Sequence, residues 1–128
     1  MVVGGLAVHY YIPERKVDDL DILIEPSQET HKKLLSALNS PYFKPTFTAE
    51  QIAQPKKIRI SVKVDFNLDI LTPAPEMDFS KEWDIARVAM LGITPVRVAA
   101  IETLLKLLIS SQEPKHLRDV ALLKQVNR

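Results

Sequence analysis

The sequence predicts an α+β fold, with a mixed β-sheet, helices packed on one side and a helical pair at the C-terminus. Three observations predict it. Strand, helix and strand patterns follow one another in the first 24 residues, the middle of the chain is rich in strand patterns, and apolar residues recur at helical spacing after residue 99. At 128 residues, 46% hydrophobic and 26% charged, the chain fits a single domain over residues 1–128.

The N-terminal part predicts two strands and two helices. An apolar strand at Val2-Val3 runs into a glycine pair that opens a short helix from Gly5 to Tyr11, which Pro13 ends. Residues 17–24 alternate between acidic and apolar side chains, as on a half-buried strand. After Pro26 and Ser27, leucines at helical spacing predict a helix over 28–38.

The rest of the chain predicts strands and then helices. Residues 39–55 predict a loop with a short helical piece near Ala49–Ala53. The apolar run from Ile58 to Leu71 is too long for an ordinary strand, so we expect an antiparallel hairpin that turns at Val64–Asn67. A polar connection through Trp83 leads to a strand pair at 85–91 and 93–98. Helices at 99–110 and 115–126 then form a C-terminal pair, about 99–127, that Glu113-Pro114 interrupts.

The composition of the chain disfavours or excludes several classes of protein. A net charge of +1 disfavours a general nucleic-acid or membrane-surface protein, so a polyanion site must be local. The absence of cysteine excludes disulfides and cysteine-based zinc sites. No apolar run is long enough to cross a bilayer and no signal-peptide pattern is present, so we expect a cytoplasmic protein.

Two carboxylates and a glycine pair are the first candidate site. Asp19 and Asp21 stand two apart on the predicted strand, so they share one face with about 6.5–7 Å between their Cα atoms. Carboxylates so placed can share a divalent metal ion, and the alternative is a pair of solvent-facing acids. Gly4 and Gly5 let the backbone approach a ligand closely and point N–H groups at an anion.

The order of these residues resembles a known family. The pair Gly4-Gly5, then Arg15, the Asp19-x-Asp21 strand and a later acid at Asp69 resemble the nucleotidyltransferase superfamily in its small prokaryotic branch. That branch includes the minimal nucleotidyltransferases and the AbiEii-type toxin nucleotidyltransferases. The resemblance extends over most of the chain. It implies metal-dependent transfer of a nucleoside monophosphate from a nucleoside triphosphate such as ATP to a hydroxyl of a protein, an RNA or a small molecule.

The resemblance also implies roles for the acids. Asp19 and Asp21 would be catalytic ligands of a two-ion magnesium site. Asp69 would complete that site and accept the proton of the attacking hydroxyl. Asp65 is the other acid considered for this position, with turn capping as its alternative role.

Four further residues would contact the nucleotide. Gly4 and Gly5 would approach the triphosphate through backbone N–H groups, and Arg15 would offset phosphate charge unless it is only a solvated loop cation. Lys106 is a candidate phosphate ligand, and its alternative is an exposed cation paired with Glu102 one helical turn away. In the same C-terminal helices, Asp119 could orient Lys106 or Arg118, or lie at the surface.

Two departures from the family pattern favour an alternative function. Gly5 stands where many members have serine, and Val17 stands where serine or threonine is common. The alternative is a catalytically inactive module of the same fold that binds or regulates a partner. The resemblance implies a second protein in a toxin–antitoxin pair, and the sequence leaves a homodimer open. The chain's histidines, His9, His31 and His116, show no ligand spacing with one another, so we assign them no metal.

Overall fold

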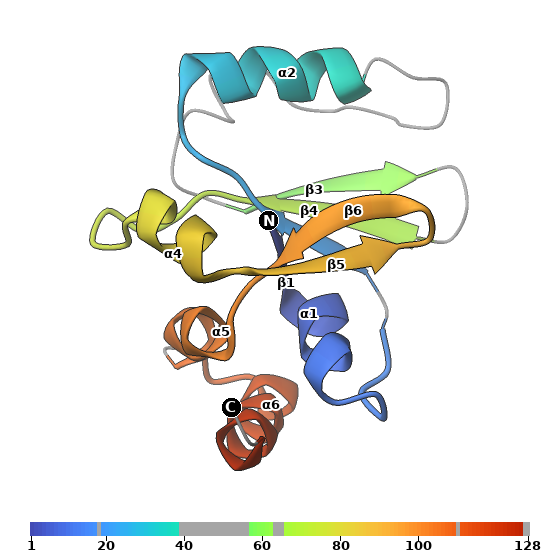
Figure 1. The fold of residues 1–128 in the computed structure, drawn as a ribbon, viewed down its shortest axis with the longest axis vertical. Helices are drawn as coiled ribbons and strands as arrows, with labels where there is room; N and C mark the ends of the chain where they lie inside the picture. The colour runs from blue at the N-terminus through green and yellow to red at the C-terminus, as the bar shows by residue number, and fades with distance from the viewer. Residues whose placement is uncertain (18, 39–56, 63–65, 110, 127–128) are drawn as a thin grey trace.

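The fold is a mixed β-sheet flanked by helices (Figure 1). The computed structural model describes residues 1–17, 19–38, 57–62, 66–109 and 111–126. In chain order the elements are β1 Val2–Val3, α1 Gly4–Tyr11, β2 Leu20–Leu23, α2 Gln28–Leu38, β3 Lys57–Val62, β4 Phe66–Leu71, α4 Phe79–Ile85, β5 Arg87–Leu91, β6 Thr94–Val98, α5 Ile101–Leu108 and α6 Pro114–Gln125. The predicted α+β class is confirmed.

The described strands form a single sheet in the order β3-β4-β2-β1-β6-β5. β2 pairs antiparallel with β1 and parallel with β4, whereas β1 pairs parallel with β6. The outer pairs, β3 with β4 and β5 with β6, are antiparallel. The short strands β1 and β2 therefore lie at the centre of the sheet, and both lead to or from the predicted site residues.

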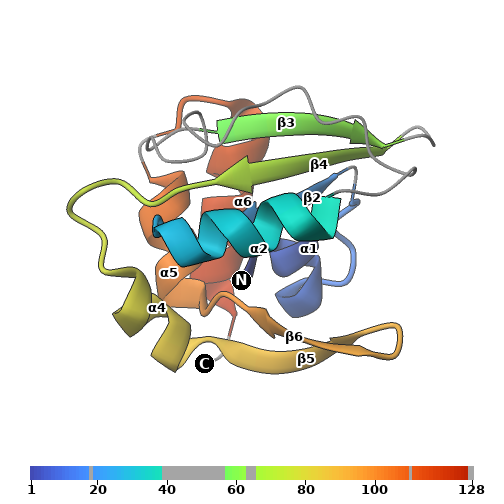
Figure 2. The ribbon, with the colours of Figure 1, turned by 90° about the horizontal axis from the view of Figure 1, so that it is seen from above.

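The helices cover the two faces of the sheet unequally. α1, α5 and α6 lie on one face, and α2 lies across the opposite face (Figures 1 and 2). The prediction of helices on one side thus holds for the first helix and the C-terminal pair, while the second helix lies on the other face. The site described below belongs to the face that α1, α5 and α6 cover.

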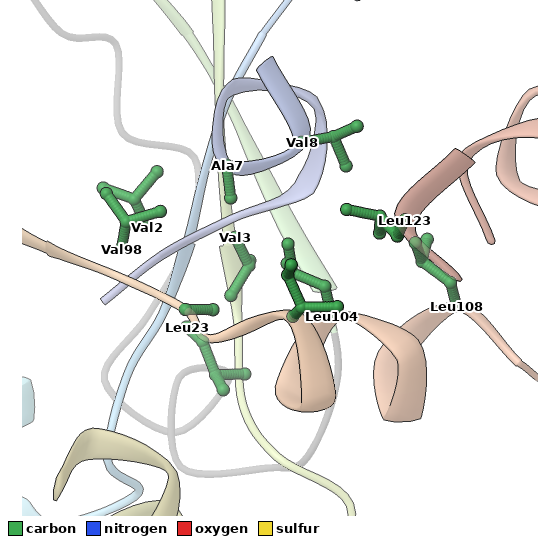
Figure 3. Close-up of a cluster of buried hydrophobic side chains, with 11 residues drawn as sticks. Val2, Val3, Ala7, Val8, Leu23, Val98, Leu104, Leu108 and Leu123 are labelled. Carbon is green, nitrogen blue, oxygen red and sulfur yellow. The ribbon is translucent and has the colours of Figure 1, made fainter. Parts of the chain in front are cut away.

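The apolar core lies between the sheet and these three helices (Figure 3). Val3 of β1 and Val8 of α1 meet Leu104 of α5 and Leu123 of α6, and all four side chains are almost fully buried. On α5 the buried residues Ile101, Leu104 and Leu108 follow the three- and four-residue spacing of one helix face. This packing joins β1 and α1, at the start of the chain, to the C-terminal helices α5 and α6.

Most predicted elements are confirmed, with shifted bounds. α2 has the predicted limits, and the Ser27 hydroxyl at its start accepts a hydrogen bond from the Thr30 N–H at 3.1 Å. The hairpin of β3 and β4 is confirmed, but its turn is shorter than predicted, because Phe66 and Asn67 belong to β4. Val64 and Asp65 lie outside the described residues, as does the whole of the loop predicted at 39–55. The strand predicted over 17–24 covers only Leu20–Leu23.

One element was predicted wrongly. The segment expected to be a polar connection contains the helix α4, and this helix takes Ile85 from the predicted strand. Asp78 begins the helix, because its side chain accepts a hydrogen bond from the Lys81 N–H at 3.4 Å. Phe79 stacks near Trp83 on the same helix. The helix has only seven residues, too few to display a clear apolar period in the sequence.

Tyr11 at the end of α1 gives a prediction for pH dependence. Its hydroxyl donates a hydrogen bond to the Ala99 carbonyl oxygen at 2.8 Å. Burial raises the pKa of Tyr11 above 10.0, while the nearby charge of Arg87 opposes part of this effect. Because the folded state then holds the phenol proton more tightly than the unfolded state, stability is expected to fall as the pH rises above about 10. Titration of the folded protein followed by tyrosine absorbance should show that Tyr11→Phe removes a phenol that ionises at a higher pH than an ordinary tyrosine. Loss of a phenol that ionises at the ordinary pH or below it would contradict the prediction.

Candidate functional site

A pocket between the sheet and the C-terminal helices contains nearly all the residues predicted for the site. Gly4, Gly5, Arg15, Asp19, Asp21 and Asp69 line it from α1, the loop after α1, β2 and β4. Leucines of α5 and the first turns of α6 line its other side. We call it the acid pocket. Lys106 lies elsewhere in the described part of the chain.

The register of β2 and β4 places two of the acids next to each other. Asp21 and Asp69 are direct partners in the parallel pairing of these strands. Neighbouring strands lie about 4.8 Å apart and register partners project to the same face, so both carboxylates emerge on the α1 side of the sheet. Asp69 is 1% exposed and Asp21 is half-buried. Asp19 comes directly before β2 and lines the same pocket.

Gly4 brings the start of α1 against the Asp21 carboxylate. Its φ is +65°, in the left-handed region that favours glycine. A Cβ atom on Gly4 would lie 2.2 Å from Asp21 Oδ2, a separation that cannot be tolerated. The Val3 side chain makes no capping hydrogen bond to the helix. The N–H groups in the first turn of a helix have no partner within that helix. In α1 these groups therefore lie beside the acids.

Arg15 lies over Gly5 and is held by an acid from the C-terminal helix. A Cβ on Gly5 would lie 3.5 Å from both terminal nitrogens of the guanidinium. Nε donates to Asp119 Oδ1 at 2.9 Å and Nη2 donates to Asp119 Oδ2 at 3.2 Å, a bidentate geometry. Nη1 donates to the Lys16 carbonyl oxygen. Within the described parts of the chain these bonds use three of the five guanidinium N–H donors, which leaves two for a ligand in the pocket.

The position of Asp119 differs from the prediction. We expected it to orient Lys106 or Arg118 or to lie at the surface, but it is buried and its carboxylate binds Arg15, which lies 104 positions away in the sequence. Asp119 is 2% exposed, whereas its neighbour Arg118 is exposed, because successive residues of a helix point about 100° apart. The buried carboxylate therefore partners the loop arginine and not its own neighbour.

The structure does not bring Lys106 to the acid pocket. Its Nζ atom lies 2.6 Å from Oε1 and 3.3 Å from Oε2 of Glu82, a buried residue of α4. Lys106 and Glu82 line another pocket, between α4 and α5. The sequence could not reveal this partner, because α4 itself was not predicted. Asp65, the other acid considered for the third position, lies outside the described residues.

Three residues at the start of α6 form a cluster that the sequence analysis missed. Ser111 Oγ lies 2.6 Å from His116 Nδ1, and the Glu113 N–H donates to the same Oγ at 3.2 Å. His116 Nε2 lies 3.9 Å from Glu113 Oε2. Glu113 and His116 both line the acid pocket. The histidines had been compared only with one another as metal ligands, so the nearby serine was not considered.

The acids are suited to a magnesium ion that a substrate helps to bind. In the part of the chain that the structure describes, no group of three or more His, Asp or Glu side chains is arranged as a ready-made metal site. Magnesium usually binds through one or two protein carboxylates, several waters and the phosphates of a substrate. The paired Asp21 and Asp69, with Asp19 in the same pocket, fit that donor set.

Comparison with known proteins adds no family assignment. The sequence matches no protein-family model and no curated protein.

None of the helices described here is both long and apolar enough to span a membrane.

Proposed function

We propose that the protein is a metal-dependent nucleotidyltransferase that moves a nucleoside monophosphate from a nucleoside triphosphate to a hydroxyl acceptor. The observation that carries the proposal is the register pairing of Asp21 with Asp69 directly beside Gly4 at the start of α1. It sets two carboxylates next to a run of backbone N–H groups. Carboxylates that hold a metal and N–H groups that bind phosphate are two features that phosphoryl-transfer sites use.

Each pocket residue has a role in this proposal. Asp19, Asp21 and Asp69 would hold magnesium, which when bound would offset the negative charge of the triphosphate. The start of α1 would bind phosphate oxygens through its N–H groups, with Arg15 donating from above Gly5. The acceptor oxygen would form a bond to the α-phosphorus as the bond to the β-phosphate oxygen breaks and pyrophosphate leaves. A pocket carboxylate, Asp69 in our proposal, would take the acceptor proton.

Calorimetric titration with Mg²⁺ and a panel of nucleoside triphosphates tests this proposal. We expect nucleotide binding that requires the metal and that weakens at least tenfold, about 1.4 kcal/mol, in Asp21→Asn and in Asp69→Asn. These substitutions keep the shape of the side chain but remove its charge. Asp84→Asn, at an exposed position of α4, is the matched control and should bind as the wild type does. Equal binding by all the variants would contradict the proposal.

A second candidate function is a binding or regulatory module that keeps the fold without catalysis. The Arg15–Asp119 pair favours it, since the charge of Arg15 is already balanced by a buried carboxylate. The two candidates differ in turnover. Metal-dependent nucleotide binding with no release of pyrophosphate in the presence of any acceptor would favour the module.

The proposed reaction also bears on location and partners. Because nucleoside triphosphates and magnesium are abundant in the cytoplasm, we propose a cytoplasmic enzyme. A partner protein of the toxin–antitoxin kind is proposed on the resemblance described above. A pull-down with the full chain as bait would test for such a partner.

A further inference from the structure

The cluster of Ser111, Glu113 and His116 has the geometry of an activated hydroxyl. The Glu113 N–H donates to Ser111 Oγ at 3.2 Å, so Oγ is an acceptor on that side. A hydroxyl that accepts one hydrogen bond still has its own proton to give, and it donates that proton to His116 Nδ1, 2.6 Å away, in the tautomer that carries the ring proton on Nε2. A nucleophile and a base within 2.6–3.2 Å of each other, with the base oriented by a third group, are the signature of covalent catalysis.

The Glu113 carboxylate lies near the other ring nitrogen of His116, at an ion-pair distance longer than a hydrogen bond. With Nδ1 as acceptor, the neutral ring carries its proton on Nε2, which faces Glu113 Oε2 at 3.9 Å. This tautomer is assigned from the hydrogen-bond arrangement. If Nδ1 takes the serine proton, the imidazolium gains a carboxylate neighbour that stabilises its positive charge.

The cluster lies at the edge of the acid pocket. The Ser111 N–H donates to the Leu108 carbonyl oxygen at 3.0 Å, and Leu108, Glu113 and His116 all line the pocket. Ser111 is half-buried. A nucleotide held by Asp21 and Asp69 would therefore share its pocket with the base that faces the serine.

A simpler role for Ser111 would be to order the turn before α6. Ser27 plays that role at α2, where its hydroxyl accepts the Thr30 N–H and bonds to the Thr30 hydroxyl at 2.9 Å. The arrangement at Ser111 has an additional member, because a histidine that lines the pocket faces the hydroxyl. A capping serine does not need such a base.

From this juxtaposition we infer that Ser111 is an acceptor hydroxyl and that the protein transfers a nucleoside monophosphate to its own Ser111. The inference rests on the proposed function and names an acceptor for it. For this acceptor His116 replaces Asp69 as the base, because His116 Nδ1 is the group that lies against the serine hydroxyl. The Ser111 proton passes to His116 Nδ1, the Oγ atom forms a bond to the α-phosphorus, and the bond from that phosphorus to the β-phosphate oxygen breaks. Pyrophosphate leaves with that electron pair, so the step is balanced without an oxidant or reductant.

Intact-mass measurement of the full chain, incubated with Mg²⁺ and each nucleoside triphosphate in turn, tests the inference. We expect an added mass of one nucleoside monophosphate less water, mapped by peptide sequencing to Ser111. The adduct should be absent in Ser111→Ala and retained in Ser111→Thr, which restores a hydroxyl. His116→Gln should slow its formation by roughly 10²–10⁴-fold, the usual contribution of a general base. Ser27→Ala is the matched control and should be modified as the wild type is.

Nucleotide binding measured on the same samples separates the two proposals. If nucleotide binds in an Asp21-dependent manner and no adduct forms on Ser111, the self-modification is wrong and the proposed function stands. The same conclusion follows if Ser111→Ala gains the same mass as the wild type. If the folded wild type binds no nucleotide, both proposals fall. A serine that only orders the turn would change thermal stability in Ser111→Ala and yield no adduct in any variant.

Discussion

Asp119→Ala is expected to lower the free energy of unfolding by about 3–5 kcal/mol, the usual result of removing one partner from a buried ion pair. The Asp119 carboxylate is 2% exposed and binds Arg15 through two hydrogen bonds. Without it, the guanidinium keeps its charge in a site where it is only 18% exposed. Because that exposure lets some water reach the charge, we expect a value near the lower end of this range. Urea denaturation followed by circular dichroism measures it.

Two comparisons show whether the loss comes from the ion pair. Asp84→Ala removes an aspartate at an exposed position of α4 and should change stability by no more than about 0.5 kcal/mol. In a double-mutant cycle, Arg15→Ala in the Asp119→Ala background should cost much less than Arg15→Ala alone, because the charge to be stranded is then absent. The account would be contradicted if the losses of unfolding free energy in Arg15→Ala and Asp119→Ala simply added in the double mutant. It would also be contradicted if Asp119→Ala were as stable as Asp84→Ala.

Local sequence patterns predicted the elements that carry their own signals. The leucine spacing and Ser27 predicted α2 with the correct limits, and the length of the run from Ile58 to Leu71 predicted a hairpin. α4 has no comparable signal. Two of its three apolar residues, Trp83 and Ile85, are exposed, so the sequence of the helix does not mark a buried face, and the helix was missed.

The site could be predicted only as far as its residues are close in sequence. Alternation placed Asp19 and Asp21 together, but nothing in the local pattern specifies that Asp69 is the register partner of Asp21 across parallel strands. The resemblance to a known family supplied Asp69. The partners of Arg15 and Lys106 lie in distant helices, and these pairs depend on how the helices pack. Sequence spacing does not contain that information.

Gly4→Ala is expected to be one of the most damaging single changes in the protein, at about 2–5 kcal/mol of unfolding free energy. An alanine at φ +65° costs about 1–2 kcal/mol in backbone strain. Its Cβ would also lie 2.2 Å from Asp21 Oδ2 and 2.8 Å from Asp21 Cβ. Asp21 cannot move away easily, because its backbone pairs with Val3 on one side and Asp69 on the other. Overpacking of this kind costs about 1–3 kcal/mol more, and thermal denaturation would measure the total.

The other two glycines of the chain separate strain from contact. Gly92 has φ +63°, and among the described residues, its own chain neighbours aside, no atom lies within 4 Å of the position that a Cβ would take there. Gly92→Ala should therefore show the backbone strain alone, about 1–2 kcal/mol. Gly5→Ala places its Cβ at an ordinary 3.5 Å from the Arg15 guanidinium and should be neutral or stabilising by up to about 1 kcal/mol.

These three variants also test the link between Gly4 and the proposed activity. Because Gly4 is the glycine that contacts Asp21, metal-dependent nucleotide binding should weaken in Gly4→Ala below its unfolding temperature and persist in Gly92→Ala. If both variants lose the same stability and both bind nucleotide normally, the close approach of Gly4 to the acids has neither the energetic nor the functional role that we assign to it. A larger loss in Gly4→Ala for both properties would instead show that the start of α1 and the Asp21 carboxylate must be in contact for the pocket to bind its substrate.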